Sequence, residues 1–150
     1  MLSQKTNTAM NTALTSPIEA AHALAPLIRE HAAEIERTRE LPKTVFNAIA
    51  DAGIFHLVVP REIGGPELDY PSFVRVMEIL GKADASTAWA VNQGATFGGF
   101  AARMAPHVAR KIWMETPRSV VANTPGPSAK AVRVTRVSPS TPRSKVRTRM

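Results

Sequence analysis

The sequence of 150 residues contains no cysteine and no long apolar run. The absence of cysteine excludes disulfide bonds, thiolate catalysis and cysteine-ligated zinc, and it favours a reducing compartment. No segment reaches the roughly 20 apolar residues of a membrane-spanning helix, and residues 1–15 lack the apolar stretch of a secretory signal. We therefore expect a cytoplasmic protein with no membrane partner and with one core of ordinary size.

Acidic residues are absent from the last part of the chain. Residues 1–117 carry 11 Lys and Arg against 12 Asp and Glu, whereas residues 118–150 carry 8 Lys and Arg and no acid, which accounts for the net charge of +7. The basic stretch also contains no aromatic residue, leucine or isoleucine. Because such a composition cannot bury enough apolar area to offset its ordering entropy, we predict disorder for residues 135–150. Residues 1–15 lack apolar periodicity as well, and we expect them to be disordered.

The region between these ends has the pattern of helices. Ser16, Pro17 and Glu19 form a helix-start signal, in which the hydroxyl accepts from a free N–H and proline occupies the first turn. Apolar residues then recur at the spacing of one helical face. Pro26 lies within this repeat, and because it lacks an N–H donor and clashes with the preceding turn, it predicts a kink or a fresh helix start.

Further helix boundaries follow along the chain. Pro42 opens a second helix, and Gly53 stands where a left-handed C-terminal cap is expected. A third helix is predicted over residues 69–81 and a fourth after residues 84–86, the latter containing Trp89. We therefore expect an all-α fold up to about residue 116.

The fourth predicted helix, DASTAWAVNQGATFGGFAARM, is rich in small residues. Gly94, Gly98 and Gly99 each cost roughly 1 kcal/mol relative to alanine within a helix, so either packing compensates them or the helix is locally irregular. Small residues permit a tight helix contact or the close approach of a flat ligand, and both alternatives stay open. The glycine spacing differs from that of phosphate-binding loops.

Neither a metal site nor a nucleophile motif is expected. His22, His31, His56 and His107 are scattered, with no pair at metal-ligand spacing. Ser86 and Ser119 lie outside any nucleophile motif. We assign no catalytic residue and no metal ligand.

A series of motifs extends over residues 41–96: a helix that ends in ADAGIF, an LVVPREIGG turn, the helix LDYPSFVRVMEIL and the helix opening ADASTAW. Together they resemble the amino-terminal helical domain of the acyl-CoA dehydrogenase superfamily, and the resemblance covers residues 18–134. STAW and the later VVANTPGPSAKAVRV are most similar to the two-component flavin monooxygenases that hydroxylate aromatic or steroid-derived rings. The implied organisation is an acyl-CoA dehydrogenase-like helical domain over 16–117 and a short extended entry into a β-domain over 118–134.

The connector GIFHLVVPREIGG gains a context from this resemblance. In the family this stretch leaves one helix and crosses the domain to the next. Gly64 and Gly65 would permit a positive-φ turn that a Cβ disfavours. We expect Leu57, Val58 and Val59 to belong to the core rather than to a ligand site.

The resemblance also implies a flavin-dependent oxidoreductase. Full-length members bind flavin, as FAD or FMN, act on a small-molecule substrate, form homotetramers and, in the monooxygenase branch, use a flavin reductase as partner. By similarity, Trp89, Asn92 and Thr96 would line the flavin and substrate cavity, and Asn123 and Thr124 would approach the isoalloxazine edge. An ordinary core position is the alternative for Trp89. The β-domain and the catalytic carboxy-terminal bundle are missing from this sequence, so a fragment that binds no flavin and is inactive alone is expected.

The resemblance stops after Val134. There the family continues with a hairpin such as DGGYRVSGRW, whereas this chain reads TRVSPSTPRSKVRTRM. A frameshifted or truncated gene product is one explanation, and translating the gene in the other two forward frames would then recover the hairpin. The competing hypothesis is a stand-alone helical interaction domain with a basic tail that binds nucleic acid or another anion. The tail lacks interleaved aromatic residues for base stacking, which favours the first explanation.

Overall fold

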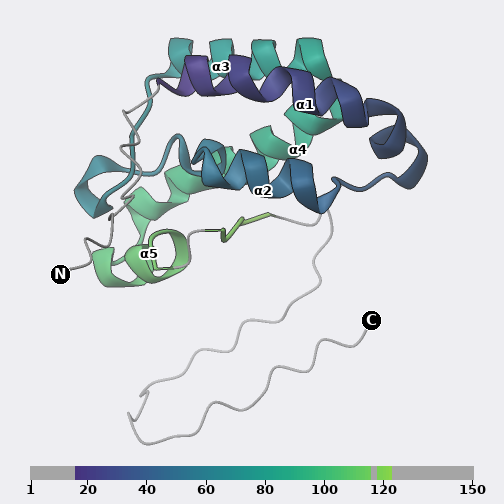
Figure 1. Ribbon diagram of the computed structural model, residues 1–150. Helices are drawn as coiled ribbons and strands as arrows, with labels where there is room; N and C mark the ends of the chain where they lie inside the picture. The colour runs from purple at the N-terminus through teal and green to yellow at the C-terminus, as the bar shows by residue number, and fades with distance from the viewer. Residues whose placement is uncertain (1–15, 116–117, 123–150) are drawn as a thin grey trace, which may run out of the picture.

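The computed structural model describes residues 16–115 and 118–122 (Figure 1). Within this part of the chain eight elements follow one another: α1 (Pro17–Thr38), α2 (Lys43–Asp51), η1 (Ile54–His56), η2 (Arg61–Ile63), α3 (Tyr70–Ala83), α4 (Ala85–Thr96), η3 (Phe97–Arg103) and α5 (Pro106–Trp113). The described residues contain no strand, so the all-α prediction is confirmed. The disorder predicted for 1–15 and 135–150, and most of the predicted β-domain entry, lie outside the described residues.

Helix α1 begins as the sequence predicts. The Ser16 hydroxyl accepts from the Glu19 N–H at 3.2 Å, and the Glu19 carboxylate accepts from the Ser16 N–H at 2.8 Å. The prediction of a fresh start at Pro26 is wrong, because α1 continues through it to Thr38. Pro26 lies on the exposed side of α1, where water can satisfy the carbonyl that loses its donor. Burial of the opposite side of the helix outweighs the lost hydrogen bond.

The helices pack in a small bundle. Figure 1 shows α1 and α3 side by side at the top, α2 and α4 beneath them, and α5 at the far end of the molecule. The main core lies between α1, α2, η1, α3 and α4, and its fully buried members include Ile28, Val45, Ile49, Ile54 and Leu80. A second cluster joins η2, η3 and α5 through Val59, Ile63, Ala101, Ala109 and Trp113.

The connector between α2 and α3 uses its two glycines for different reasons. Gly64 has a φ of 104°, which confirms the positive-φ prediction there. Gly65 does not have a positive φ, so the prediction is wrong for that residue. A Cβ on Gly65 would lie 2.2 Å from the Val59 carbonyl oxygen, which shows that close approach of two backbones requires this glycine. Leu57 and Val59 are buried and Val58 is half-buried, so these residues belong to the core as expected.

Aspartates cap both helices of the central pair. The Asp69 carboxylate accepts from the Ser72 N–H at 3.0 Å and begins α3. This bond holds the pKa of Asp69 below its ordinary value. Asp84 both ends α3 and begins α4, and its carboxylate accepts from the Thr87 N–H at 2.6 Å. The predicted starts of both helices are confirmed, although α3 extends to Ala83, two residues past the expected end.

We expect replacement of Asp84 with alanine to lower the free energy of unfolding by about 1 kcal/mol, since an N-cap acceptor is lost. Asp84→Asn should recover most of that loss, because an amide oxygen also caps a helix. Urea denaturation followed by circular dichroism measures both. Equal stability of the alanine and asparagine variants would show that the cap does not contribute.

The glycines of the fourth predicted helix are explained both by close packing and by a local irregularity of the helix. A Cβ on Gly94 would lie 2.7 Å from the Val120 side chain and 2.9 Å from Phe55, so this glycine admits close packing. From Phe97 onward the chain tightens into the 3-10 helix η3, which is the local irregularity. Gly98 approaches Val59 in the same way, with a Cβ distance of 2.9 Å to its side chain.

Residues 118–122 return along the body of the molecule. The Arg118 guanidinium donates to both carboxylate oxygens of Asp51 at 2.9 Å and to the Asn47 amide oxygen at 3.1 Å. The Ser119 carbonyl oxygen lies 2.9 Å from His56 Nε2. These contacts fix the direction of the segment and bring the Val120 side chain against Gly94 of α4.

Candidate functional site

One face of α4 presents the three side chains that the family motif indicates. Trp89, Asn92 and Thr96 lie three and four residues apart, a spacing that places them on one side of a helix. Trp89 is 66% exposed, so the alternative that it is an ordinary core residue is wrong. The Thr96 hydroxyl donates to the Asn92 backbone carbonyl at 2.6 Å. The same hydroxyl oxygen lies 3.3 Å from Asn92 Oδ1, so the two side chains are neighbours on this face.

A row of open hollows follows this face. The first has a volume of about 330 Å³ and lies between α3 and α4, against Met77, Gly81, Ala85, Ala88, Trp89 and Asn92. The second, of about 200 Å³, is lined by Thr96, Gly99, Phe100 and Arg103. The third, of about 280 Å³, is lined by Phe97, Phe100, Met104, Ile112, Trp113 and Val121. Phe100 lines both the second and the third hollow, and Asn92 of the first hollow contacts Thr96 of the second, so the three hollows are neighbours; we call the face that carries them the α4 surface.

The chemistry of this surface is apolar with a few fixed polar groups. Among the described residues that line the three hollows, only Arg103 is ionisable. The rings of Phe97 and Phe100 stack with centroids 5.5 Å apart. Such a surface can hold a flat or apolar ligand and orient it through the Asn92 amide and the Thr96 hydroxyl. It offers no group suited to proton transfer at neutral pH.

The described residues contain neither a cluster of metal ligands nor a membrane-spanning helix. Within residues 16–115 and 118–122, no three His, Asp or Glu side chains lie close enough to share a metal ion. None of the helices in this part of the chain has the length and apolar character needed to cross a membrane. His31 and His56 instead contact backbone carbonyl oxygens of Leu27 and Ser119.

The structure brings together three of the five predicted site residues. Trp89, Asn92 and Thr96 share the α4 surface, whereas Asn123 and Thr124 lie outside the described residues. Their contact with flavin stays a prediction. Helix α3 also contributes to the site, which the sequence pattern does not predict: Met77 and Gly81 form the far wall of the first hollow. Gly81 is the small residue that leaves room for this hollow, but a single glycine does not specify which helix faces Trp89.

Comparison with known proteins gives a family match. The family described as "Acyl-CoA dehydrogenase, N-terminal domain" matches residues 19–119. The oxygenase subunit HsaA of a flavin-dependent monooxygenase from Rhodococcus jostii (strain RHA1) is 34% identical over 67 residues, which are 45% of this chain and 18% of that protein. Indole-3-acetate monooxygenase from Pseudomonas putida is 29% identical over 97 residues, or 65% of this chain and 23% of that protein.

A dehydrogenase is also similar. Cyclohex-1-ene-1-carbonyl-CoA dehydrogenase from Syntrophus aciditrophicus (strain SB) is 38% identical over 61 residues, which are 41% of this chain and 15% of that protein. This chain therefore spans less than a quarter of the length of each of these three relatives. The activities in their names belong to proteins several times larger.

Proposed function

The chain belongs to the family of acyl-CoA dehydrogenase amino-terminal domains, and from this premise we propose that its α4 surface forms one wall of the ligand cavity of a flavin-dependent oxidoreductase. The observation that carries the proposal is the 66% exposure of Trp89. A tryptophan side chain of this size is costly to leave in water unless a partner or ligand covers it. The neighbouring hollows provide the room for one.

We propose further that the parent enzyme is an aromatic- or steroid-ring hydroxylase that uses reduced flavin and O₂. Two of the relatives are named as monooxygenases, which supports the monooxygenase branch. The apolar, aromatic character of the α4 surface suits a planar substrate ring. In such an enzyme a flavin reductase supplies the reduced cofactor, and the oxygenase is a homotetramer. The similarity to a dehydrogenase keeps an acyl-CoA substrate as the second candidate.

The residues present suit one side of a flavin site, whether the cofactor is FAD or FMN. When bound, the flavin would supply the redox chemistry. Trp89 would pack against a ring, the Asn92 amide would donate or accept a hydrogen bond at its edge, and Thr96 would hold that amide in place. Asn123 and Thr124 are proposed to contribute from the segment after Ala122.

We expect this chain alone to bind no flavin and to turn over no substrate. A site must enclose most of its ligand to bind it well, and the α4 hollows are open on one side. Absorbance of the purified chain at flavin wavelengths after gel filtration is the measurement. Recovery of a stoichiometric yellow complex would contradict the proposal that only one wall is encoded here.

The two tryptophans should differ in accessibility. Trp89 is 66% exposed and Trp113 is 2% exposed, so acrylamide should quench the emission of Trp89 several-fold more efficiently than that of Trp113. The variants Trp89→Phe and Trp113→Phe separate the two signals. Similar quenching in both variants would show that the α4 surface is covered, for example by self-association through its exposed apolar side chains.

A further inference from the structure

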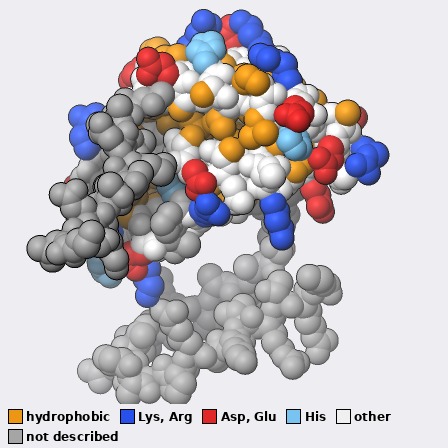
Figure 2. Space-filling model, viewed as in Figure 1, with side chains coloured by type: hydrophobic (Ala, Val, Ile, Leu, Met, Phe, Trp, Pro, Cys, Tyr) orange, Lys and Arg blue, Asp and Glu red, His pale blue; other side chains and the backbone are white. Residues whose placement is uncertain are grey.

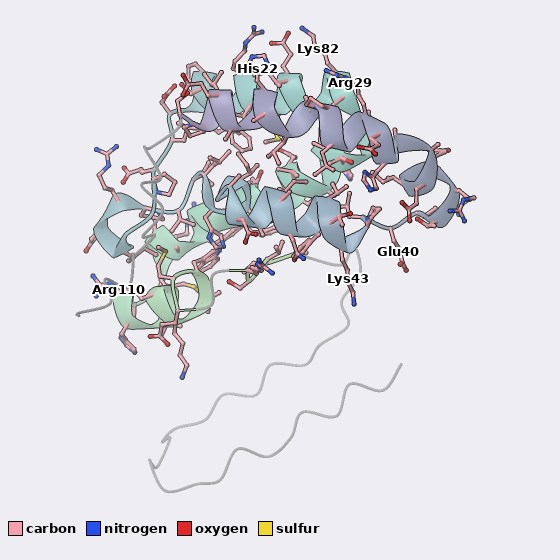
Figure 3. The ribbon with its side chains drawn as sticks, in the orientation of Figure 1. His22, Arg29, Glu40, Lys43, Lys82 and Arg110 are labelled. Carbon is pink, nitrogen blue, oxygen red and sulfur yellow. The ribbon has the colours of Figure 1, made fainter. Side chains whose placement is uncertain are left out.

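A further hollow, separate from the three on the α4 surface, lies on the outer side of α1 and α3. Its volume is about 160 Å³ and it shares no lining residue with the α4 hollows. Four of its lining side chains are basic: His22, Arg29, Arg75 and Lys82. Its floor is apolar and includes Pro26 and Ile79. Figure 3 shows His22, Arg29 and Lys82 projecting from the same edge of the molecule.

The spacing of the four basic residues is regular. His22 and Arg29 are seven residues apart on α1, and Arg75 and Lys82 are seven residues apart on α3. Seven residues correspond to two helical turns, or about 10 Å along the axis. Because α1 and α3 pack against each other, the basic side chains stand around the apolar floor rather than along a single line. Long side chains at such positions can converge on one ligand.

The hollow is more basic than the rest of the helical region. Residues 1–117 contain 11 Lys and Arg against 12 Asp and Glu, so a surface of average composition would be nearly neutral. No acidic side chain lines this hollow. Figure 2 shows Lys and Arg side chains and a histidine along this upper edge, with an acidic side chain among them.

Glu78 prepares two of the cations for binding. Its carboxylate accepts from Lys82 Nζ at 2.7 Å and from Arg75 Nη1 at 2.5 Å, although Glu78 itself does not line the hollow. Lys82 and Arg75 keep the pKa of Glu78 below its ordinary value, so the Glu78 carboxylate remains charged at neutral pH. Each cation retains further N–H donors for a ligand. Among the described residues, Arg29 has no acidic partner, which leaves its charge uncompensated.

We propose that this hollow binds a small anion that carries two or more phosphate groups. A single phosphate is small enough to contact only part of this lining, whereas an oligophosphate can contact Arg75 and Lys82 on α3 and extend to Arg29 on α1. The apolar floor would accept a base or another flat group attached to the phosphates. The ligand is therefore either a free oligophosphate or a nucleotide.

The test is an NMR titration of the full 150-residue chain labelled with ¹⁵N. Inorganic tripolyphosphate should shift the amide signals of Arg29, Ile79 and Lys82, and orthophosphate should do so much more weakly. ATP should bind as tightly as tripolyphosphate if only phosphates are recognised, and more tightly if the floor holds the base. Affinity should fall with added salt, as expected for exposed charges.

Paired variants decide the outcome. Arg29→Ala with Lys82→Ala should weaken tripolyphosphate binding by roughly tenfold, the product of two exposed charge contacts. The control Arg37→Ala with Lys43→Ala removes the same charge from exposed positions outside the hollow and should change binding by less than about twofold. Equal weakening in both pairs, or signal shifts confined to the basic residues 118–150, would overturn the proposal.

Discussion

Replacement of Gly65 with alanine is expected to destabilise the protein by about 3 kcal/mol or more, since overpacking against rigid neighbours exceeds the usual cost of a core change. The new Cβ would lie 2.2 Å from the Val59 carbonyl oxygen and 2.5 Å from the Val59 Cβ. A backbone atom cannot rotate away as a flexible side chain can. The Gly65 N–H also donates to the Pro60 carbonyl at 3.0 Å, so the chain is held from both directions.

The loop around Gly65 cannot shift without further losses. The Glu67 N–H donates to the same Val59 carbonyl at 3.0 Å, and the Leu68 N–H donates to the Leu57 carbonyl at 2.8 Å. Val59 is fully buried in the cluster that joins η2, η3 and α5. We therefore expect the variant to lose packing of α5 as well as the loop, which urea denaturation and near-ultraviolet circular dichroism would detect.

Gly99 provides the matched control. No atom lies within 4 Å of a Cβ built on Gly99, and its φ is not positive. Gly99→Ala should therefore be neutral or stabilise by up to about 1 kcal/mol, because alanine restricts the unfolded chain. If Gly65→Ala were as stable as Gly99→Ala, the close approach between Gly65 and Val59 would not exist in solution.

Local signals account for the parts of the fold that the sequence predicts correctly. The capping side chains of Ser16, Asp69 and Asp84 accept hydrogen bonds from N–H groups three residues away, so their capping role does not depend on residues distant in the sequence. Gly53, with a φ of 70°, ends α2 for an equally local reason. These positions are therefore readable from a single sequence.

The errors involve residues whose roles depend on distant contacts. Pro26 predicts a kink or a fresh helix start, but no fresh start occurs, because Ala25 and Ile28 beside it are buried and their packing stabilises a continuous α1. The reason for Gly65 is the approach of Val59, which depends on how the connector folds back. Neither the packing beside Pro26 nor the approach of Val59 to Gly65 can be predicted from the spacing of residues along the chain.

The same distinction applies to the α4 surface. The positions of Trp89, Asn92 and Thr96 on one helical face follow from their spacing, and their selection as site residues came from the family motif. Whether Trp89 is buried could not be decided from a segment filled with small residues, because such a helix has no clear apolar face. The contribution of Met77 from α3 depends on the packing of α3 against α4.

Truncation of the two tryptophans should change the stability of the protein to very different extents. Trp113 is 2% exposed and packs in the cluster that joins η2, η3 and α5, so Trp113→Ala should cost about 3–5 kcal/mol, the range for deleting a buried aromatic side chain. That is a large part of the 5–15 kcal/mol or so that stabilises an ordinary domain. Trp89→Ala should change stability by less than about 0.5 kcal/mol, since the exposed ring has little packing to lose.

Trp113→Phe separates packing from polarity at the buried position. The indole Nε1 of Trp113 has no hydrogen-bond partner among the described residues, so phenylalanine removes an unpaired donor together with some volume. It should therefore lose less than half of what Trp113→Ala loses. Thermal and urea unfolding of the three variants measure the differences, and a large loss for Trp89→Ala would contradict our assignment of that residue to a ligand surface. Because a residue that contributes little to folding has no structural reason to be a tryptophan, a stable Trp89→Ala variant would strengthen the proposal that this side chain serves ligand binding.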